Sequence, residues 1–167
     1  DVFSGCSSLE NFNIPQMFEY SEDRKTIVYC NYGEFIKSVK IPNGICDIGN
    51  RAFEECSSLQ NIDIPASVTN IDLAALVDCP SLERINVSHD NTSYKSIDGV
   101  LYNKCLTTII FFPPKHKSIS FSIPNGIINI DVSAFLDCSS LQNINIPKSV
   151  TVINHFAFCN CTSLQSI

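Results

Sequence analysis

The residues best suited to chemistry in this 167-residue chain are its nine cysteines, which could bind a metal, form disulfides or act as nucleophiles. Five of them occupy one position of a repeated motif: Cys6, Cys56, Cys79, Cys138 and Cys161. Recurrence at one position favours a small side chain stacked on its copy in the next turn of chain, because a buried free cysteine behaves as a small hydrophobe. We predict buried free thiols. Disulfides between neighbouring coils are the alternative, since strands in a sheet lie about 4.8 Å apart.

Metal binding and catalysis find little support in the remaining residues. The spacing of Cys159 and Cys161 is too tight for an ordinary zinc pair, and no second pair lies nearby. His89, His116 and His155 fall in different parts of the repeat, away from any recognisable nucleophile motif. The carboxylates show no facing pair, and no glycine-rich phosphate loop is present. We therefore expect no enzyme, no cofactor and no catalytic or metal site.

The elements that position these residues are copies of a 23-residue repeat. The stretch AFEECSSLQNIDIPASVTNI, residues 52–71, returns as AFLDCSSLQNINIPKSVTVI, residues 134–153. Four units begin at residues 41, 64, 123 and 146, and a fifth is cut at the N-terminal end. The register survives two enlarged coils, at about residues 16–40 and 88–122. A period of this length predicts a stack of coils around one core.

Each coil is predicted to place one short strand in a parallel sheet. Residues two apart share a face of a strand, so Ile62 and Ile64 point inward while Asn61 and Asp63 point outward. A proline follows in most coils and ends the strand, because it has no N–H for the ladder. The leucines at one repeat position should then line up in a shared interior column: Leu59, Leu82 and Leu141.

The second half of each coil carries a weaker pattern. A second apolar pair, such as Val68 and Ile71, predicts a short extended segment on the opposite side. An Ala-Phe pair follows, at residues 52–53 and 134–135, where a turn of helix and an irregular bend are both compatible with the flanking residues.

Taken together, the motif I-P-x-x-V-T-x-I-x-x-x-A-F-x-x-C-x-S-L-x-x-I resembles the BspA-type leucine-rich repeat, in five copies over roughly two-thirds of the chain. The resemblance implies a leucine-rich repeat solenoid, a β-rich right-handed coil with a parallel sheet on its concave face, in a single domain over residues 1–167. Family members are associated with surface proteins and with adhesion, and the resemblance brings no catalytic residues. One departure is Ala75-Leu76, where leucine replaces phenylalanine.

Both enlarged coils carry a hairpin signal. Residues 94–103, YKSIDGVLYN, place an Asp-Gly pair between apolar and aromatic residues, and residues 106–113 predict a further strand. Residues 17–30 have a polar turn at 21–25 between two similar runs. We predict two β-hairpin insertions that project from the solenoid. The basic turn Lys115-His116-Lys117 that follows is interpreted as a solvated loop.

Charge and hydropathy restrict the partners. A net charge of −6 and a pI of about 4.9 argue against a nucleic-acid partner, and no apolar run is long enough for membrane insertion. The chain starts inside a coil, without methionine, and shows no polar cap at either end, so we interpret it as a fragment of a longer array. Exposed terminal coils would also permit end-to-end self-association.

The predicted binding surface is the outward face of the main sheet, because solenoids use extended concave surfaces for recognition. Its candidate residues are Asn11, Asn13, Lys40, Asn61, Asp63, Arg84, Asn86, Asn143 and Asn145. The alternative is the hairpins, whose aromatic residues either anchor a partner or pack onto the solenoid: Tyr94, Tyr102, Phe111 and Phe112. Sequons at Asn86, Asn91 and Asn160 could carry glycans in an exported protein.

Two functional classes remain open. The first is an adhesion or recognition module at the cell surface or outside the cell, with a protein or glycan ligand, as the family resemblance implies. The second is a cytoplasmic leucine-rich repeat scaffold fused to another domain, which unpaired cysteines favour because disulfides are rare in reducing compartments.

Overall fold

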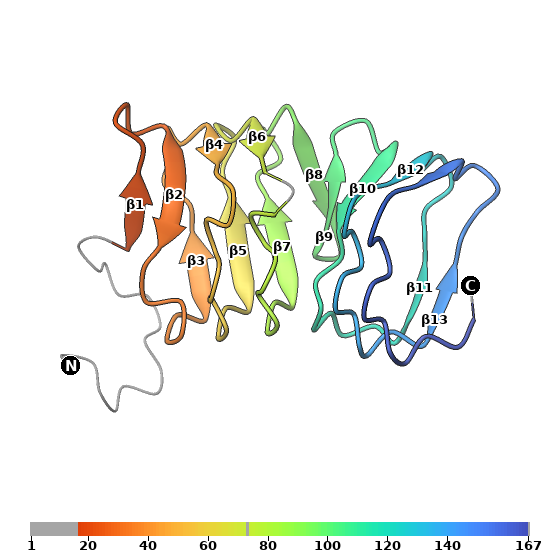
Figure 1. The fold of residues 1–167 in the computed structure, drawn as a ribbon. Coiled ribbons are helices and arrows are strands. Elements are labelled where there is room, and N and C mark those ends of the chain that lie inside the picture. Colours follow the sequence, from red (N-terminus) through yellow and green to blue (C-terminus); the bar gives the residue numbers. More distant parts are fainter. Residues whose placement is uncertain (1–16, 73, 167) are drawn as a thin grey trace.

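The computed structural model describes residues 17–72 and 74–166, and within them every regular element is a β-strand. The coils stack side by side into an elongated solenoid, with β1 and β2 at one end and β13 near the other (Figure 1). The main sheet is formed by β3 (Ser38–Lys40), β5 (Asn61–Ile64) and β7 (Arg84–Val87), and further on by β11 (Ser120–Ser122) and β13 (Asn143–Asn145).

The second sheet runs along the other edge of the solenoid, also in two parts. One part contains β1 (Phe18–Tyr20), β2 (Thr26–Cys30), β4 (Asp47–Ile48) and β6 (Asn70–Ile71). The other part contains β8 (Tyr94–Ile97), β9 (Val100–Asn103), β10 (Thr108–Phe111), β12 (Asn129–Ile130) and β14 (Val152–Ile153).

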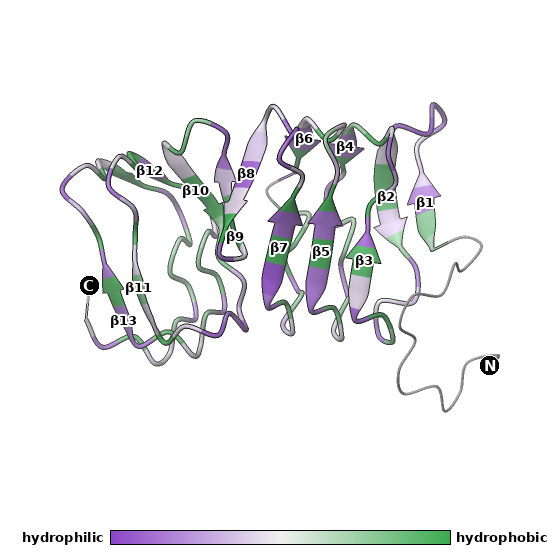
Figure 2. Cartoon of the chain, turned by 180° about the vertical axis from the view of Figure 1, so that it is seen from behind, coloured by the Kyte–Doolittle hydropathy of each residue, from purple (hydrophilic) through white to green (hydrophobic). Residues whose placement is uncertain are grey.

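The main sheet has the register that the 23-residue period predicts. Val39, Ile62 and Ile85 are paired across β3, β5 and β7, and all three are buried. On each strand, the residues just before and just after this buried position face outward, so polar and apolar positions alternate along the strand (Figure 2). A one-residue slip would turn the isoleucines into water, which is why the repeat length fixes the pairing.

The second half of each coil also follows the predicted pattern. Two-residue strands pair in parallel on the opposite side, with Ile48 beside Ile71 and Ile130 beside Ile153. The Ala52-Phe53 segment is a series of turns, so the irregular bend is confirmed over the helix. Arg51 and Glu55 flank it with φ angles of 53° and 63°, in the left-handed region that no helix of several residues adopts.

The three leucines of the predicted interior column are buried, since Leu59, Leu82 and Leu141 are 1%, 0% and 1% exposed. The prediction that they share one column is wrong, because Leu59 and Leu82 belong to one buried cluster and Leu141 to another. Phenylalanine rings stack along a parallel column, with centroids 5.1 Å apart for Phe112 and Phe135 and 5.0 Å apart for Phe135 and Phe158. Stacked aromatic pairs stabilise a fold by roughly 0.5–1.5 kcal/mol beyond the area that they bury.

An antiparallel strand pair stands at each of the two places where a hairpin is predicted. β1 pairs with β2, and β8 pairs with β9 around the Asp98–Gly99 turn. The prediction that these hairpins project from the solenoid is wrong. β2 pairs in parallel with β4, and β9 joins β12 through β10, so both hairpins extend the second sheet. Burial accounts for this, because Ile27, Leu101 and Tyr102 are enclosed by the core.

The second enlarged coil divides the solenoid. Ser118 stands 23 residues before Leu141, at the leucine position, and the buried residues form two clusters on either side of this coil. The β8–β9 hairpin and the β10 strand contribute to both clusters, Leu101 to the first and Tyr102 to the second. The hairpin region therefore joins two cores that the leucine column leaves separate.

The main sheet is divided at the same place, so the predicted binding surface on its outward face does not run unbroken along the solenoid. β7 pairs with β5 but not with β11, and the hairpin lies against its other edge. Ile85 donates its N–H to the Gly99 carbonyl at 2.9 Å, and Val87 donates to the Ser96 hydroxyl at 2.9 Å.

The Lys115-His116-Lys117 turn is not a solvated loop throughout. His116 is only 7% exposed, and its ring packs on Phe112 with centroids 4.6 Å apart. Its Nε2 lies 2.8 Å from the Asp98 carbonyl, while the Ser118 N–H donates to Nδ1 at 3.2 Å. Nε2 must therefore carry the proton, and this neutral histidine ties the hairpin turn to the second core.

The hairpin contact at Gly99 generates the first test. Gly44 and Gly99 have φ angles of +95° and +88°, so alanine is strained at either position. A Cβ at Gly99 would lie 2.8 Å from the Arg84 Cβ, whereas a Cβ at Gly44 meets nothing within 4 Å. We expect Gly44→Ala to lower the free energy of unfolding by about 1–2 kcal/mol. We expect Gly99→Ala to cost about 1–3 kcal/mol more through overpacking, as measured by urea unfolding. Equal losses would show that the hairpin turn does not bear on β7.

Candidate interaction surfaces

The outward positions of the main sheet form two rows over β3, β5 and β7. One row runs through Ser38, Asn61 and Arg84, and the other runs through Lys40, Asp63 and Asn86. The predicted residues Asn143 and Asn145 lie beside Ser120 and Ser122 on the separate β11–β13 pair. The structure therefore brings together five of the predicted site residues and leaves these two apart, while Asn11 and Asn13 lie outside the described residues.

Side-chain hydrogen bonds one period apart hold these rows in place. Asn86 donates from Nδ2 to Asp63 Oδ1 at 2.8 Å, and Asn61 donates to the Ser38 hydroxyl at 3.2 Å. On the other pair, the Ser166 hydroxyl donates to Asn143 Oδ1 at 2.9 Å. A polar surface whose rotamers are already fixed loses less entropy when a partner binds.

The row through Lys40, Asp63 and Asn86 borders an open depression of about 480 Å³ at the carboxyl ends of the three strands. Pro65, Ala66 and Val87 add apolar surface to its lining. The side chain of Lys40 forms no hydrogen bond or ion pair with the described residues, so its ammonium group is available to a ligand. The volume lies within the range of about 300–1,000 Å³ that is usual for ligand pockets.

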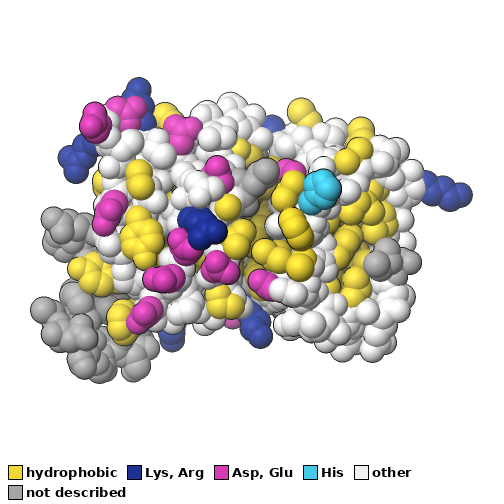
Figure 3. Space-filling model, in the orientation of Figure 1, with side chains coloured by type: hydrophobic (Ala, Val, Ile, Leu, Met, Phe, Trp, Pro, Cys, Tyr) yellow, Lys and Arg dark blue, Asp and Glu magenta, His cyan; other side chains and the backbone are white. Residues whose placement is uncertain are grey.

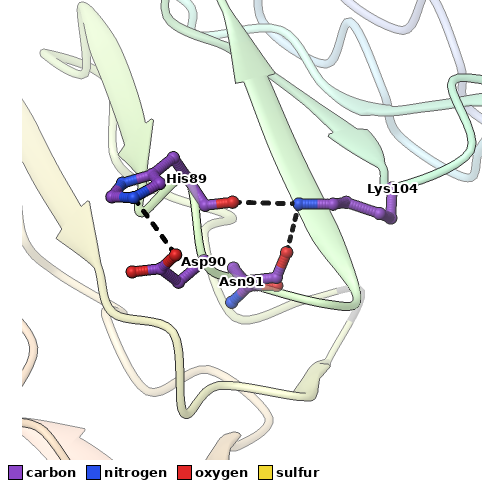
Figure 4. A network of polar contacts seen from close by, with 4 residues as sticks. All are labelled: His89, Asp90, Asn91 and Lys104. Carbon is purple, nitrogen blue, oxygen red and sulfur yellow. Dashed lines mark hydrogen bonds and ion pairs between the residues drawn. The ribbon is translucent and has the colours of Figure 1, made fainter.

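One wall of the depression comes from the loop that leaves β7, and this loop is firmly anchored. Ser88 and Asp90 line the depression. Lys104, which follows β9, donates from Nζ to the His89 carbonyl at 3.2 Å and also to the Asn91 carbonyl (Figure 4). His89 Nε2 lies 3.1 Å from an Asp90 carboxylate oxygen, in an exposed pair of little energetic weight. Sequence reasoning did not select this loop.

Asn91 is the buried anchor of the same loop. Its side chain is fully buried, and Nδ2 donates to the Pro65 and Val68 carbonyls at 2.9 and 2.8 Å. Its Oδ1 accepts from the Ser93 and Tyr94 N–H groups at 2.9 and 2.8 Å. The only sequence signal for this role is that Asn91 stands 23 residues after Val68.

The burial of Asn91 also determines whether its sequon can carry a glycan. An amide nitrogen enclosed by two carbonyls cannot carry a glycan in the folded protein, so the proposed acceptor at Asn91 is wrong. Asn86 and Asn160 are exposed, although Nδ2 of each donates 2.8 Å to an aspartate, Asp63 and Asp137 respectively.

The hairpin aromatics are structural. Tyr102, Phe111 and Phe112 are buried, so the hypothesis that they anchor a partner is wrong for all three. Tyr94 is half-buried, and its hydroxyl accepts the Ile71 N–H at 3.0 Å, at the edge of the first half of the second sheet. These side chains attach the hairpin to the solenoid.

The eight described cysteines are free thiols. At the repeat position, Cys56, Cys79 and Cys138 are buried as predicted, whereas Cys161, in the last described coil, is only half-buried and Cys6 lies outside the described residues. Burial raises the pKa of Cys79, and a hydrogen bond with Cys161 together with burial raises the pKa of Cys138. Within residues 17–72 and 74–166, no three His, Cys, Asp or Glu side chains come together in a way that could hold a metal ion. The same segments contain no helix with the length and hydropathy needed to cross a membrane.

Comparisons with known proteins agree with this architecture. The family model described as "BspA type Leucine rich repeat region" matches residues 25–120 and 112–167, in six copies. Among curated proteins, no sequence matches the chain.

Solved structures of similar fold come from bacteria. A leucine-rich repeat protein of Eubacterium ventriosum is 28% identical with a TM-score of 0.72, over 77% of this chain and 40% of its own length. A leucine rich cell surface protein of Faecalibacterium prausnitzii is 32% identical with a TM-score of 0.64, over 80% of this chain and 41% of its own. The pneumococcal vaccine antigen PcpA, at 22% identity and a TM-score of 0.68 over 78% of this chain and 39% of its own, shares the fold. The chain thus spans about two-fifths of these proteins.

The anchoring role of Asn91 is testable by stability. Asn91→Ala leaves two buried carbonyls and two N–H groups without partners, so we expect a loss of about 3–5 kcal/mol in the free energy of unfolding. Asn145→Ala, at an exposed position of β13, serves as the control and should stay within about 0.5 kcal/mol. A loss at Asn91 no larger than the control would contradict this role.

Thiol reactivity tests the cysteine column. Because the thiolate is the reactive form, a buried thiol with a raised pKa should react slowly. We expect N-ethylmaleimide at pH 8 to modify exposed Cys105 in the native protein, and to reach Cys79 and Cys138 only after urea unfolding. Peptide mass spectrometry reports each site. Modification of Cys79 at the rate of Cys105 in the native protein would refute the buried column.

Proposed function

Because this chain belongs to the BspA-type leucine-rich repeat family, we propose that it is a non-enzymatic interaction module that binds a protein or glycan ligand on its main sheet. The observation that carries the proposal is the depression at the ends of β3, β5 and β7, which spans three coils and has a preformed polar border. Extended surfaces built from repeated coils are the usual recognition surfaces of solenoids.

The chemistry of the depression suits a polar ligand with some flat apolar surface. Lys40 offers a cation, Asp63 and Asp90 offer carboxylates, and Asn86 offers an amide. Pro65 and Val87 provide the apolar surface on which a sugar ring or an aliphatic side chain can rest. Asp63 already accepts a hydrogen bond from Asn86, which leaves its second carboxylate oxygen for the ligand.

A location at the cell surface and a role in adhesion are the finer part of the proposal. The support comes from the family and from the Faecalibacterium prausnitzii relative, which is itself a leucine rich cell surface protein. The second candidate is a cytoplasmic scaffold, which the eight free cysteines favour, because exported proteins usually oxidise such thiols where geometry allows. A disulfide between neighbouring coils in protein isolated from its native host would favour the surface location.

Charge reversal tests the binding surface. We expect Lys40→Glu, Asp63→Lys and Arg84→Glu together to weaken binding at least tenfold on arrays of immobilised glycans and extracellular matrix proteins, because each reverses a charge on the two rows. Asn143→Asp with Asn145→Lys changes charges on the separate β11–β13 pair and should leave binding unchanged. Unchanged thermal unfolding of both variants shows that the fold is intact. Ligand binding that survives in the triple variant would place the site elsewhere.

A further inference from the structure

On the face opposite the main sheet, a small hollow lies between the two halves of the solenoid. Its volume is about 180 Å³, below the range of about 300–1,000 Å³ for small-molecule pockets, so it would hold one side chain. Leu76, Phe111 and Pro114 are buried in its floor, and Asp78 and Asp137 stand among its lining residues. Figure 3 shows apolar side chains gathered near the middle of this face, with acidic side chains beside them.

The hollow arises because one residue cannot adopt the backbone conformation that the equivalent residues of the other described coils share. The position two residues after the phenylalanine site is occupied, coil by coil, by Tyr32, Glu55, Asp78, Pro114, Asp137 and Asn160. All except Pro114 have φ angles between 59° and 66°. The φ angle of proline is fixed near −65° by its ring, so Pro114 cannot adopt this left-handed conformation. The chain therefore leaves the repeat geometry at Pro114, and Lys115 donates its N–H to the distant Leu82 carbonyl at 2.8 Å.

The same break leaves the Asp78 carboxylate without a partner in the column. At the last step of the same column, Asn160 reaches back one period and donates to Asp137 Oδ1 at 2.8 Å. The corresponding neighbour of Asp78 is Pro114, which has no donor. Asp78 forms no hydrogen bond or ion pair with the described residues, and Asp137 has its second oxygen left over. No lysine or arginine is among the described residues that line the hollow.

We propose that this hollow binds an arginine side chain presented by a partner protein. The aliphatic stem of arginine matches the apolar floor, and its planar guanidinium can pair with both carboxylates. The net charge of −6 favours the approach of a basic segment at long range. This site is separate from the main-sheet depression, so either can fail without the other.

A matched pair of peptides tests the proposal. The probe is acetyl-Leu-Arg-Leu-amide, and its control is the same peptide with citrulline, which has nearly the same shape but no charge. We expect the arginine peptide to shift the methyl NMR signals of Leu76, Val77 and Leu136 in a saturable way, with at least fivefold higher affinity than the citrulline peptide. Higher salt should reduce that difference, because the carboxylates lie at the surface.

Two double variants separate the local charges from the net charge. Asp78→Asn with Asp137→Asn should abolish the preference for arginine, and asparagine tolerates the left-handed conformation at both positions. Glu19→Gln with Glu22→Gln removes the same charge from exposed positions of the β1–β2 hairpin and should preserve the preference. Equal affinity for the two peptides, an equal loss in both double variants, or the absence of saturable shifts would overturn the proposal.

Discussion

The constraint on which this molecule depends is that a single coil can neither bury its apolar side nor pair its own strands. Each strand of a 23-residue coil pairs between two and four residues with the strand of the next coil, and the neighbouring coil supplies both hydrogen bonds and cover for the apolar side. Two copies of one repeat position show the effect. Ile130, which lies between β10 and β14, is 0% exposed, whereas Ile153, which pairs only with β12 among the described strands, is 53% exposed. The same side chain is buried when it has a neighbouring coil on both sides and exposed when it has one on a single side. The stability of the fold therefore comes from the contacts between coils.

This dependence explains how the enlarged coils are tolerated. Extra residues could be accepted as loops only if the next coil still found a surface to pair with. The β1–β2 and β8–β9 hairpins provide that surface, because β2 and β10 each present a strand edge on which β4 and β12 pair in parallel. The second insertion breaks the main sheet and the leucine column at Ser118, but Leu101 and Tyr102 restore apolar contact on both sides. His116 and Tyr94 then fasten the hairpin to each half by hydrogen bonds.

Features that the period determines could be predicted from sequence, whereas features that depend on the departures from it could not. The isoleucine register, the buried cysteines and the outward residues Lys40, Asp63 and Asn86 follow from a spacing of 23 that anyone can count. The path of the hairpins does not, since alternating aromatic residues are compatible with both a projecting and a packed hairpin. Asn91 was also beyond reach, because the Pro65 and Val68 carbonyls that it bonds come together only after two coils have stacked. A polar residue in a loop gives no local sign of such partners.

A repeat also has a consequence for where binding sites can arise. Identical coils produce identical grooves, which offer no reason for a ligand to choose one place along the solenoid. Specific places appear where the period is broken. One wall of the main-sheet depression is made by the loop after β7, which Lys104 of the second enlarged coil holds. The hollow on the opposite face exists because Pro114 cannot follow the conformation of Asp78 and Asp137. Both sites border the second enlarged coil, where contacts of the hairpin replace the regular contacts between stacked coils. The irregular coil therefore determines where along the solenoid a ligand can bind, and the regular coils form the rigid frame that holds the site in place.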